Sequence, residues 1–229
     1  MRIGALQRVS LIDYPGFICA VVFLQGCNFR CSYCHNPELV DSSLFKSCLK
    51  ENDLMEFLDS RRGKLDAVSI TGGEPTMQEK LPSFISQIKK MGFAVKLDTN
   101  GSSPEVIRNL IEDKLLDYIA MDIKAPFDKY KEVANANVNQ DFIRESIKII
   151  LKAKVPYEFR TTVVQSQLDE KDILNIGKMI QGASRYVLQK FVPSKVLDNK
   201  FLKEKAMSDE KLQNIKNNLE KHIPNVIIR

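Results

Sequence analysis

Short apolar runs and helix-like segments alternate along most of this chain, and this alternation constrains the fold more than any other feature. Residues 18–24 are continuously apolar and rich in β-branched side chains, which is typical of a buried strand. Five more runs are predicted as strands, at residues 66–71, 94–99, 118–123, 157–164 and 186–191. The helices predicted between and after them lie at residues 52–61, 81–91, 141–153, 172–180 and 208–219, and one more opens at 103–105.

Six strands separated by helices predict a parallel sheet with right-handed crossovers. A complete eight-unit barrel usually needs about 250 residues, whereas this chain has 229. We therefore expect an α/β fold with a partial (β/α)6 TIM-like barrel of parallel strands. Its active site is expected at the C-terminal ends of the strands, where every polar motif described below falls. We expect residues 1–229 to form a single domain.

Composition and the N-terminal residues indicate where such a protein works. The hydrophobic fraction of 44% and the charged fraction of 28% are ordinary for a soluble globular protein. No apolar run reaches the roughly 20 residues of a membrane helix, and Arg2, Arg8 and Asp13 interrupt any signal-peptide core. Five cysteines, three of them crowded together, favour a reducing compartment over a disulfide framework. We therefore expect a cytoplasmic protein without a membrane partner.

The distribution of charge argues against a nucleic-acid partner. The net charge of +5 is mild, and the basic residues are spread along the chain. The group formed by Lys89, Lys90 and Lys96 is interpreted as a solvated face.

Three cysteines, Cys27, Cys31 and Cys34, directly follow the first predicted strand. Thiolates are soft ligands that suit iron–sulfur clusters and zinc. Because a [4Fe–4S] cube needs a ligand at each of its four irons, three thiolates leave one iron open to a non-protein ligand. This spacing predicts a cluster with an open position where chemistry can take place.

The alternative is a zinc ion with a fourth ligand from elsewhere in the chain. His35 adjoins Cys34 too closely to bind the same ion easily. Cys19 lies within the strand and Cys48 in a polar connection, so neither is an obvious fourth ligand. An iron–sulfur cluster is therefore favoured over zinc.

Polar motifs also end the next three predicted strands. Gly72 and Gly73 remove side chains where a backbone must approach a ligand closely, and Pro75 stiffens the exit, although alone this segment would be only a turn. Asp98 ends one strand, and Lys124 follows another. The simpler interpretation is that Asp98 with Asn100 caps a turn and that Lys124 pairs with Asp122 or Asp128 on the surface.

The cysteine motif and the segment Gly72-Gly73-Glu74-Pro75, in these places, resemble the radical S-adenosylmethionine superfamily. Within it, three segments look like the activating enzymes of glycyl-radical proteins: Asp13-Tyr14-Pro15-Gly16, Gln25-Gly26-Cys27-Asn28-Phe29-Arg30-Cys31 and Tyr33-Cys34-His35-Asn36-Pro37. The likeness is greatest to anaerobic ribonucleoside-triphosphate reductase activating proteins, and pyruvate formate-lyase activating enzyme is similar. The resemblance spans residues 9–192, and residues 193–229 are expected to form a helical extension.

The resemblance implies a [4Fe–4S] cluster held by Cys27, Cys31 and Cys34, with S-adenosylmethionine chelating the open iron. Reductive cleavage would then give methionine and a 5′-deoxyadenosyl radical that abstracts hydrogen from a substrate. A monovalent cation is also implied, near Asp98 and Asp122. The residues implied to contact the cofactor are Tyr33, Asn36, Gly72, Gly73, Glu74, Pro75, Asp98, Lys124, Arg160 and Gln189.

The favoured function is an activase that installs a glycyl radical on a partner enzyme, with anaerobic ribonucleotide reductase as the implied partner. A flavodoxin- or ferredoxin-like protein is the implied electron donor. One alternative is a radical enzyme acting on a small molecule, because the motifs report the cofactor better than the substrate. Another is a non-catalytic iron–sulfur or zinc module, for which Cys19 or Cys48 would be needed to close the metal site.

Overall fold

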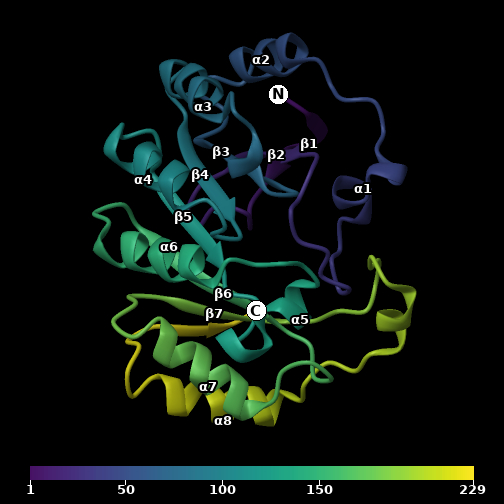
Figure 1. Cartoon of the computed structure of the whole chain (residues 1–229). Coiled ribbons are helices and arrows are strands. Elements are labelled where there is room, and N and C mark those ends of the chain that lie inside the picture. The colour runs from purple at the N-terminus through teal and green to yellow at the C-terminus, as the bar shows by residue number, and fades with distance from the viewer.

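Eight strands follow one another in chain order across a single sheet in the computed structural model, which describes residues 1–229 (Figure 1). The N-terminal strand β1 is antiparallel to β2, and every other neighbouring pair is parallel. The strands are β1 Ile3–Ser10, β2 Cys19–Leu24, β3 Ala67–Gly72, β4 Ala94–Thr99, β5 Tyr118–Asp122, β6 Tyr157–Val163, β7 Tyr186–Lys190 and β8 Val226–Ile228. The outermost strands, β1 and β8, are the two edges of the sheet, so the barrel is not closed.

Helices connect the parallel strands, and the longer ones pack on the outer side of the curved sheet, whereas the short α1 and α5 lie beside the cysteine loop (Figure 1). They are α1 Pro37–Val40, α2 Glu51–Asp59, α3 Leu81–Lys90, α4 Pro104–Glu112, α5 Tyr130–Ala134, α6 Gln140–Lys152, α7 Glu170–Met179 and α8 Asp209–Leu219. Short 3₁₀ turns occur at Ser42–Leu44, Pro75–Met77, Phe127–Lys129 and Asn199–Lys203. No helix is both long enough and apolar enough to cross a membrane.

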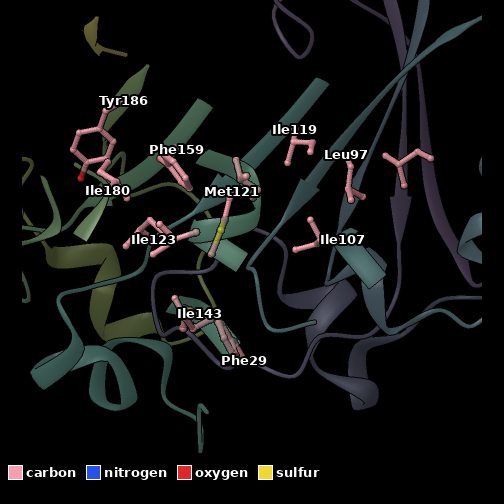
Figure 2. Packing of buried hydrophobic residues seen from close by; sticks show 14 of the residues in the cluster. Phe29, Leu97, Ile107, Ile119, Met121, Ile123, Ile143, Phe159, Ile180 and Tyr186 are labelled. Carbon is pink, nitrogen blue, oxygen red and sulfur yellow. The ribbon is translucent and has the colours of Figure 1, made fainter. Parts of the chain in front are cut away.

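The main core lies between the sheet and these helices. Side chains alternate between the two faces of a strand, and one face of β4 and β5 carries Leu97, Ile119 and Met121, which are fully buried. Figure 2 shows Leu97 near Ile107 of α4, and Ile143 of α6 belongs to the same buried cluster. Burying each such side chain stabilises the fold by about 1.5–3 kcal/mol, so this apolar face fixes the sheet against its helices.

The opposite face of the same strands is concave and polar. Lys96 and Asp98 of β4 alternate with the buried Val95 and Leu97, so they share the inner face. The prediction that Lys96 belongs to a solvated face is wrong: only 2% of the residue is exposed, and its ammonium group pairs with Asp98. Because the sheet curves, the polar face of β4 lines the interior of the partial barrel and does not face solvent.

The C-terminal residues complete this sheet. Helix α8 buries Leu212, Ile215 and Leu219 and contacts α7 and β8, which confirms the helix predicted at residues 208–219. Residues 226–228, for which the sequence allowed either an edge strand or a partner contact, form strand β8 beside β7. The extension is therefore integral to the sheet.

Candidate active site

The cysteine loop begins where β2 ends, at the C-terminal edge of the parallel strands. Its backbone is tied to two short helices, because Gly26 N–H donates to the Leu39 carbonyl at 2.8 Å and Arg30 N–H donates to the Ala134 carbonyl at 2.9 Å. Within the loop, Cys34 N–H donates to the Cys31 carbonyl at 2.9 Å. These contacts hold the loop in one shape at the edge of the sheet.

Of the three thiols of this loop, Cys31 is buried, and Cys27 and Cys34 are half-buried. Burial raises the pKa of Cys27 to about 12 and also raises the pKa of Cys31 and of Cys34. In each case Lys124 acts in the opposite direction and favours the thiolate. Because metals bind thiolates, metal loading at this loop must displace protons.

A cavity of about 210 Å³ lies between this loop and the ends of β3 to β6. Most of the residues predicted for the site line it: Cys27, Cys31, Tyr33, Cys34, Asn36, Gly72, Gly73, Glu74, Asp98, Lys124 and Arg160. Asp122, expected beside the cation, lines it as well.

Two of the predicted residues lie away from this cavity. Pro75 is buried in the first position of the 3₁₀ turn after β3. Gln189 is half-buried on β7 and pairs in register with Thr162 of β6. Thr162 lines the cavity, whereas Gln189 does not. Cofactor contacts by Pro75 and Gln189 stay predictions.

Two glycines allow the end of β3 to pack directly on the cysteine loop. Gly72 has φ +118°, and a Cβ there would lie 2.3 Å from the Leu24 backbone nitrogen. A Cβ on Gly73 would lie 2.0 Å from the Gly26 carbonyl oxygen. No other residue type fits here without displacing backbone.

Glu74, which follows these glycines, is 1% exposed. Its carboxylate accepts hydrogen bonds from Thr76 N–H at 3.1 Å, the Thr76 hydroxyl at 2.6 Å, the Thr99 hydroxyl at 2.8 Å and Asn100 N–H at 2.6 Å. Burial raises the pKa of Glu74, and these donors offset part of the rise. Both oxygens are thus engaged within the protein, although the residue lines the cavity.

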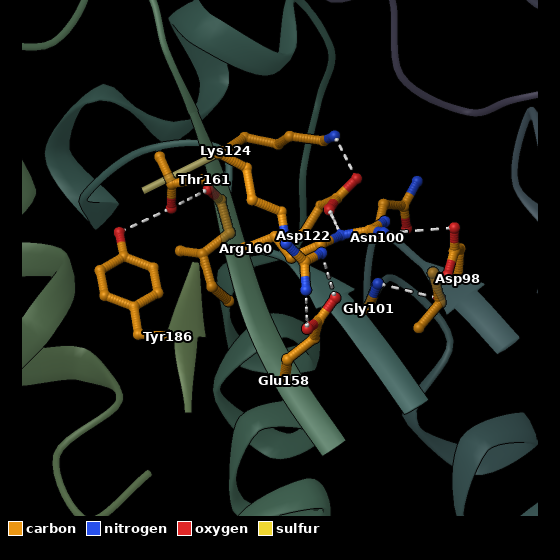
Figure 3. A network of polar contacts seen from close by, with 12 residues as sticks. Asp98, Asn100, Gly101, Asp122, Lys124, Glu158, Arg160, Thr161 and Tyr186 are labelled. Atoms are coloured by element: carbon orange, nitrogen blue, oxygen red, sulfur yellow. Dashed lines mark hydrogen bonds and ion pairs between the residues drawn. The ribbon is translucent and has the colours of Figure 1, made fainter. Parts of the chain in front are cut away.

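A chain of ion pairs forms the floor of the cavity (Figure 3). Arg160 contacts both Asp98 and Asp122, while Lys96 pairs with Asp98 and Lys124 with Asp122. Burial raises the pKa of both aspartates, but Arg160 and the lysines outweigh it and hold each pKa below its ordinary value. Burial lowers the pKa of Lys124, but Asp122 outweighs this and raises it well above the usual range.

Some lining residues were missed by sequence reasoning. Asn100 donates from Nδ2 to Asn28 Oδ1 at 2.9 Å, which connects the end of β4 to the cysteine loop. Thr162 lines the cavity from β6, and Lys96 supports it from below. Asn100 stands directly after a predicted strand, and this position in the sequence could have marked it as a residue of the site.

The residues present fit an iron–sulfur cluster with a bound small molecule. The Tyr33 hydroxyl is buried in the cavity wall without a hydrogen-bond partner in the protein, so a bound group can satisfy it. No three His, Cys, Asp or Glu side chains converge as ligands of a single ion. This arrangement fits a cube, in which each thiolate binds a different iron, better than it fits zinc.

The fourth zinc ligands considered from the sequence are also engaged elsewhere. Cys19 is buried at the far end of β2, beside Tyr14 and Tyr118. Cys48 is exposed and donates to Gln25 Oε1 at 3.3 Å. His35 Nε2 lies 2.9 Å from the Val192 carbonyl oxygen.

An open barrel of parallel strands, with three thiols in a cavity at the C-terminal ends of those strands, defines a class of enzymes that bind an iron–sulfur cluster. The Radical SAM superfamily profile matches residues 21–180, and this chain belongs to that superfamily. As a member it uses a [4Fe–4S] cluster and S-adenosylmethionine.

Two relatives match nearly the whole chain. A protein of Methanocaldococcus jannaschii, provisionally named a glycyl-radical enzyme activating enzyme, is 38% identical over 234 residues, covering 99% of this chain and 95% of the relative. The pyruvate formate-lyase-activating enzyme of Clostridium pasteurianum is 30% identical over 228 residues, covering 93% and 90%.

The solved structure of Streptococcus suis SuiB bound to precursor peptide SuiA has the same fold. It superposes with a TM-score of 0.69 at 14% identity, over 90% of this chain and 48% of the SuiB chain. This chain therefore spans about half of SuiB, and the likeness concerns the fold alone.

Proposed function

We propose that this protein is an activase that installs a glycyl radical on a partner enzyme, and that the partner is anaerobic ribonucleoside-triphosphate reductase. The observation that carries the proposal is the single cavity in which three thiols, a glycine-walled edge and a cationic floor meet. Relatives provisionally or fully named as activating enzymes of glycyl-radical proteins match nearly the whole chain. The sequence motifs that resemble ribonucleotide reductase activators support the choice of partner.

The chemistry belongs to the bound group, which when reduced supplies an electron that cleaves S-adenosylmethionine to methionine and a 5′-deoxyadenosyl radical. The protein's residues would bind the cluster and orient S-adenosylmethionine. Cys27, Cys31 and Cys34 would hold three irons, and the bare backbone of Gly72 and Gly73 admits a ligand closely.

The charged floor would bind the anionic parts of the complex. Three thiolates leave an oxidised cube with a net negative charge, and the cofactor adds a carboxylate. Arg160 and Lys124 line the same cavity and supply positive charge there. Opposite charge in a shielded site offsets the repulsion between these anions.

A protein substrate suits the open architecture. The sheet ends at β1 and β8 and does not close into a barrel, so a loop that carries the target glycine can approach from the side. The only other cysteines in this sequence are Cys19 and Cys48, and both lie away from the cavity. Electrons would come from a flavodoxin- or ferredoxin-like donor, and the reaction would take place in the cytoplasm.

Electron paramagnetic resonance tests the partner directly. The reconstituted, reduced protein is mixed anaerobically with S-adenosylmethionine and with either anaerobic ribonucleotide reductase or pyruvate formate-lyase from the same organism. We expect a glycyl-radical doublet on the reductase, which disappears when its target glycine is replaced by alanine. A doublet on pyruvate formate-lyase alone would keep the activase and reject the partner. Cofactor cleavage driven by a metabolite, with no radical on either protein, would favour the small-molecule alternative.

A further inference from the structure

All four carboxylate oxygens of Asp98 and Asp122 contact a cation that belongs to the protein. Figure 3 shows Lys124 and Arg160 beside Asp122. Asp98 Oδ1 accepts from Lys96 Nζ, and Asp98 Oδ2 lies 3.3 Å from Arg160 Nη1. Asp122 Oδ1 accepts from Arg160 Nε at 2.7 Å, and Asp122 Oδ2 accepts from Lys124 Nζ at 3.1 Å. No oxygen of either aspartate is left without a fixed positive partner.

The charges in this chain of ion pairs do not balance. Lys96, Arg160 and Lys124 carry three positive charges against the two negative charges of Asp98 and Asp122. The side chains of Lys96, Asp98 and Arg160 are only 2%, 13% and 12% exposed, so water screens them weakly. A free potassium or sodium ion would have to displace one of these cations and then lie beside the others. The donor set therefore does not fit the monovalent cation that the sequence led us to expect.

Lys96 is the member of this chain of ion pairs that has no other evident role. It lies two residues before Asp98 on the same face of β4, so its side chain can extend along the strand to the carboxylate. Tyr118 of β5, which pairs in register with Lys96, belongs to a small buried cluster with Tyr14 and Val21. A buried ammonium group beside such a cluster is stable only while it is paired.

We propose that Lys96 is the built-in counter-ion of this site, taking the place of a monovalent cation next to Asp98. Lys96 is a positioning residue: it neutralises Asp98 so that Arg160 retains positive charge toward the cavity. Binding of S-adenosylmethionine is then independent of potassium and sodium. This inference rests on cofactor binding and not on the proposed partner, so its failure would leave the activase proposal standing.

The test measures the affinity of the cluster-loaded protein for S-adenosylmethionine in KCl, NaCl and choline chloride of equal ionic strength. We expect the wild-type dissociation constant to agree within about twofold among the three salts, and the melting temperature of the apoprotein to be the same in each. A wild-type affinity that falls about tenfold or more in choline chloride would overturn the proposal.

Lys96→Met provides the complementary measurement, because it removes the charge and keeps a side chain of similar length. Its affinity should fall about tenfold or more in choline chloride and recover in KCl, since potassium can now occupy the vacated position. Lys89→Met is the matched control, because Lys89 pairs with Asp117 at the surface. It should bind as the wild type does in every salt.

The remaining outcomes are also decisive. Equal affinity of Lys96→Met and wild type in choline chloride would contradict the inference, and so would a loss that potassium does not reverse in a folded, cluster-loaded variant. If Lys96→Met does not fold or load, Lys96→Arg keeps the charge and must bind independently of potassium. A potassium requirement in Lys96→Arg would reject the proposal.

Discussion

The Glu74 carboxylate accepts a hydrogen bond from the backbone N–H of Asn100 at 2.6 Å, across the ends of β3 and β4. Its other oxygen accepts from the Thr76 and Thr99 hydroxyls and from Thr76 N–H. One buried side chain thereby joins two loops that line the cavity. Its contacts within the protein make Glu74 a clamp between neighbouring loops, and its contact with the cofactor stays a prediction.

Glu74→Gln should destabilise the apoprotein by about 1–3 kcal/mol, because the amide NH₂ group must face backbone or hydroxyl donors that now lack an acceptor. Urea unfolding of the apoprotein measures this cost without any cofactor. Glu79→Gln is the control, since Glu79 is exposed just after the same 3₁₀ turn. If both variants unfold within about 0.5 kcal/mol of the wild type, the clamp has no energetic importance.

Gly73→Ala should destabilise the protein by about 3 kcal/mol and reduce the iron bound on reconstitution, because the new methyl group meets the Gly26 carbonyl. Gly177→Ala is a useful comparison. There the Cβ would meet only the end of the Leu219 side chain, which can rotate, and alanine is the better helix former. Its stability should stay within about 1 kcal/mol of the wild type. Equal losses in the two variants would mean that the approach of β3 to the cysteine loop is not rigid.

Asp172 should make stability depend on pH. Its Oδ2 accepts from Lys129 Nζ at 2.6 Å and from Asp169 N–H at 3.0 Å. Burial raises the pKa of Asp172, but Lys129 and Asp169 outweigh it and hold it below its ordinary value. A lowered pKa in the folded state adds stability above the unfolded value of about 3.9, and this stability is lost as pH falls through the folded value.

Urea unfolding at about pH 6 and pH 3 should therefore show a larger loss for the wild type than for Asp172→Asn, by on the order of 1 kcal/mol. Asp141→Asn is the control, because Asp141 pairs with Arg144 on the surface and is 85% exposed. Its loss should match that of the wild type. A loss for Asp172→Asn as large as that of the wild type would reject the role of this carboxylate.

Much of the fold could be predicted because the parallel strands are continuous apolar runs. The predicted strand at residues 94–99 coincides with β4. Strand β1 was missed because it pairs at an edge, with several side chains exposed, and its composition includes polar residues such as Gln7 and Arg8. The prediction for Lys96 failed for a related reason. A lysine among apolar neighbours is typical of a half-exposed strand, and only the curvature of the sheet buries its polar face.

The site was predictable where one short segment carries the chemistry. The cysteines and the glycines after β3 reach the cavity through the local chain path. The partner of Glu74 could not be predicted, because the Asn100 N–H lies 26 residues further along the chain. Likewise, the pairing of Arg160 with both Asp98 and Asp122 depends on the order of three strands in the sheet.

Cysteine substitutions separate the site from the rest of the chain. Cys48→Ser should bind as much iron and sulfide as the wild type on anaerobic reconstitution, because Cys48 is exposed and its thiol donates to Gln25. Replacing any one of the three loop cysteines by alanine should lower the bound iron substantially, since each would hold one iron of the cube. Loss of iron in Cys48→Ser equal to that in Cys31→Ala would favour a closed, non-catalytic metal site.

The most direct test of the central claim is the reductive cleavage of S-adenosylmethionine by the reconstituted protein, measured as methionine and 5′-deoxyadenosine. We predict that Cys48→Ser forms as much methionine and 5′-deoxyadenosine as the wild type does. Neither product should form with Cys27→Ala, Cys31→Ala or Cys34→Ala. A wild-type protein whose cluster is loaded and reduced, yet which forms neither product alone or with a candidate partner enzyme, would contradict the account.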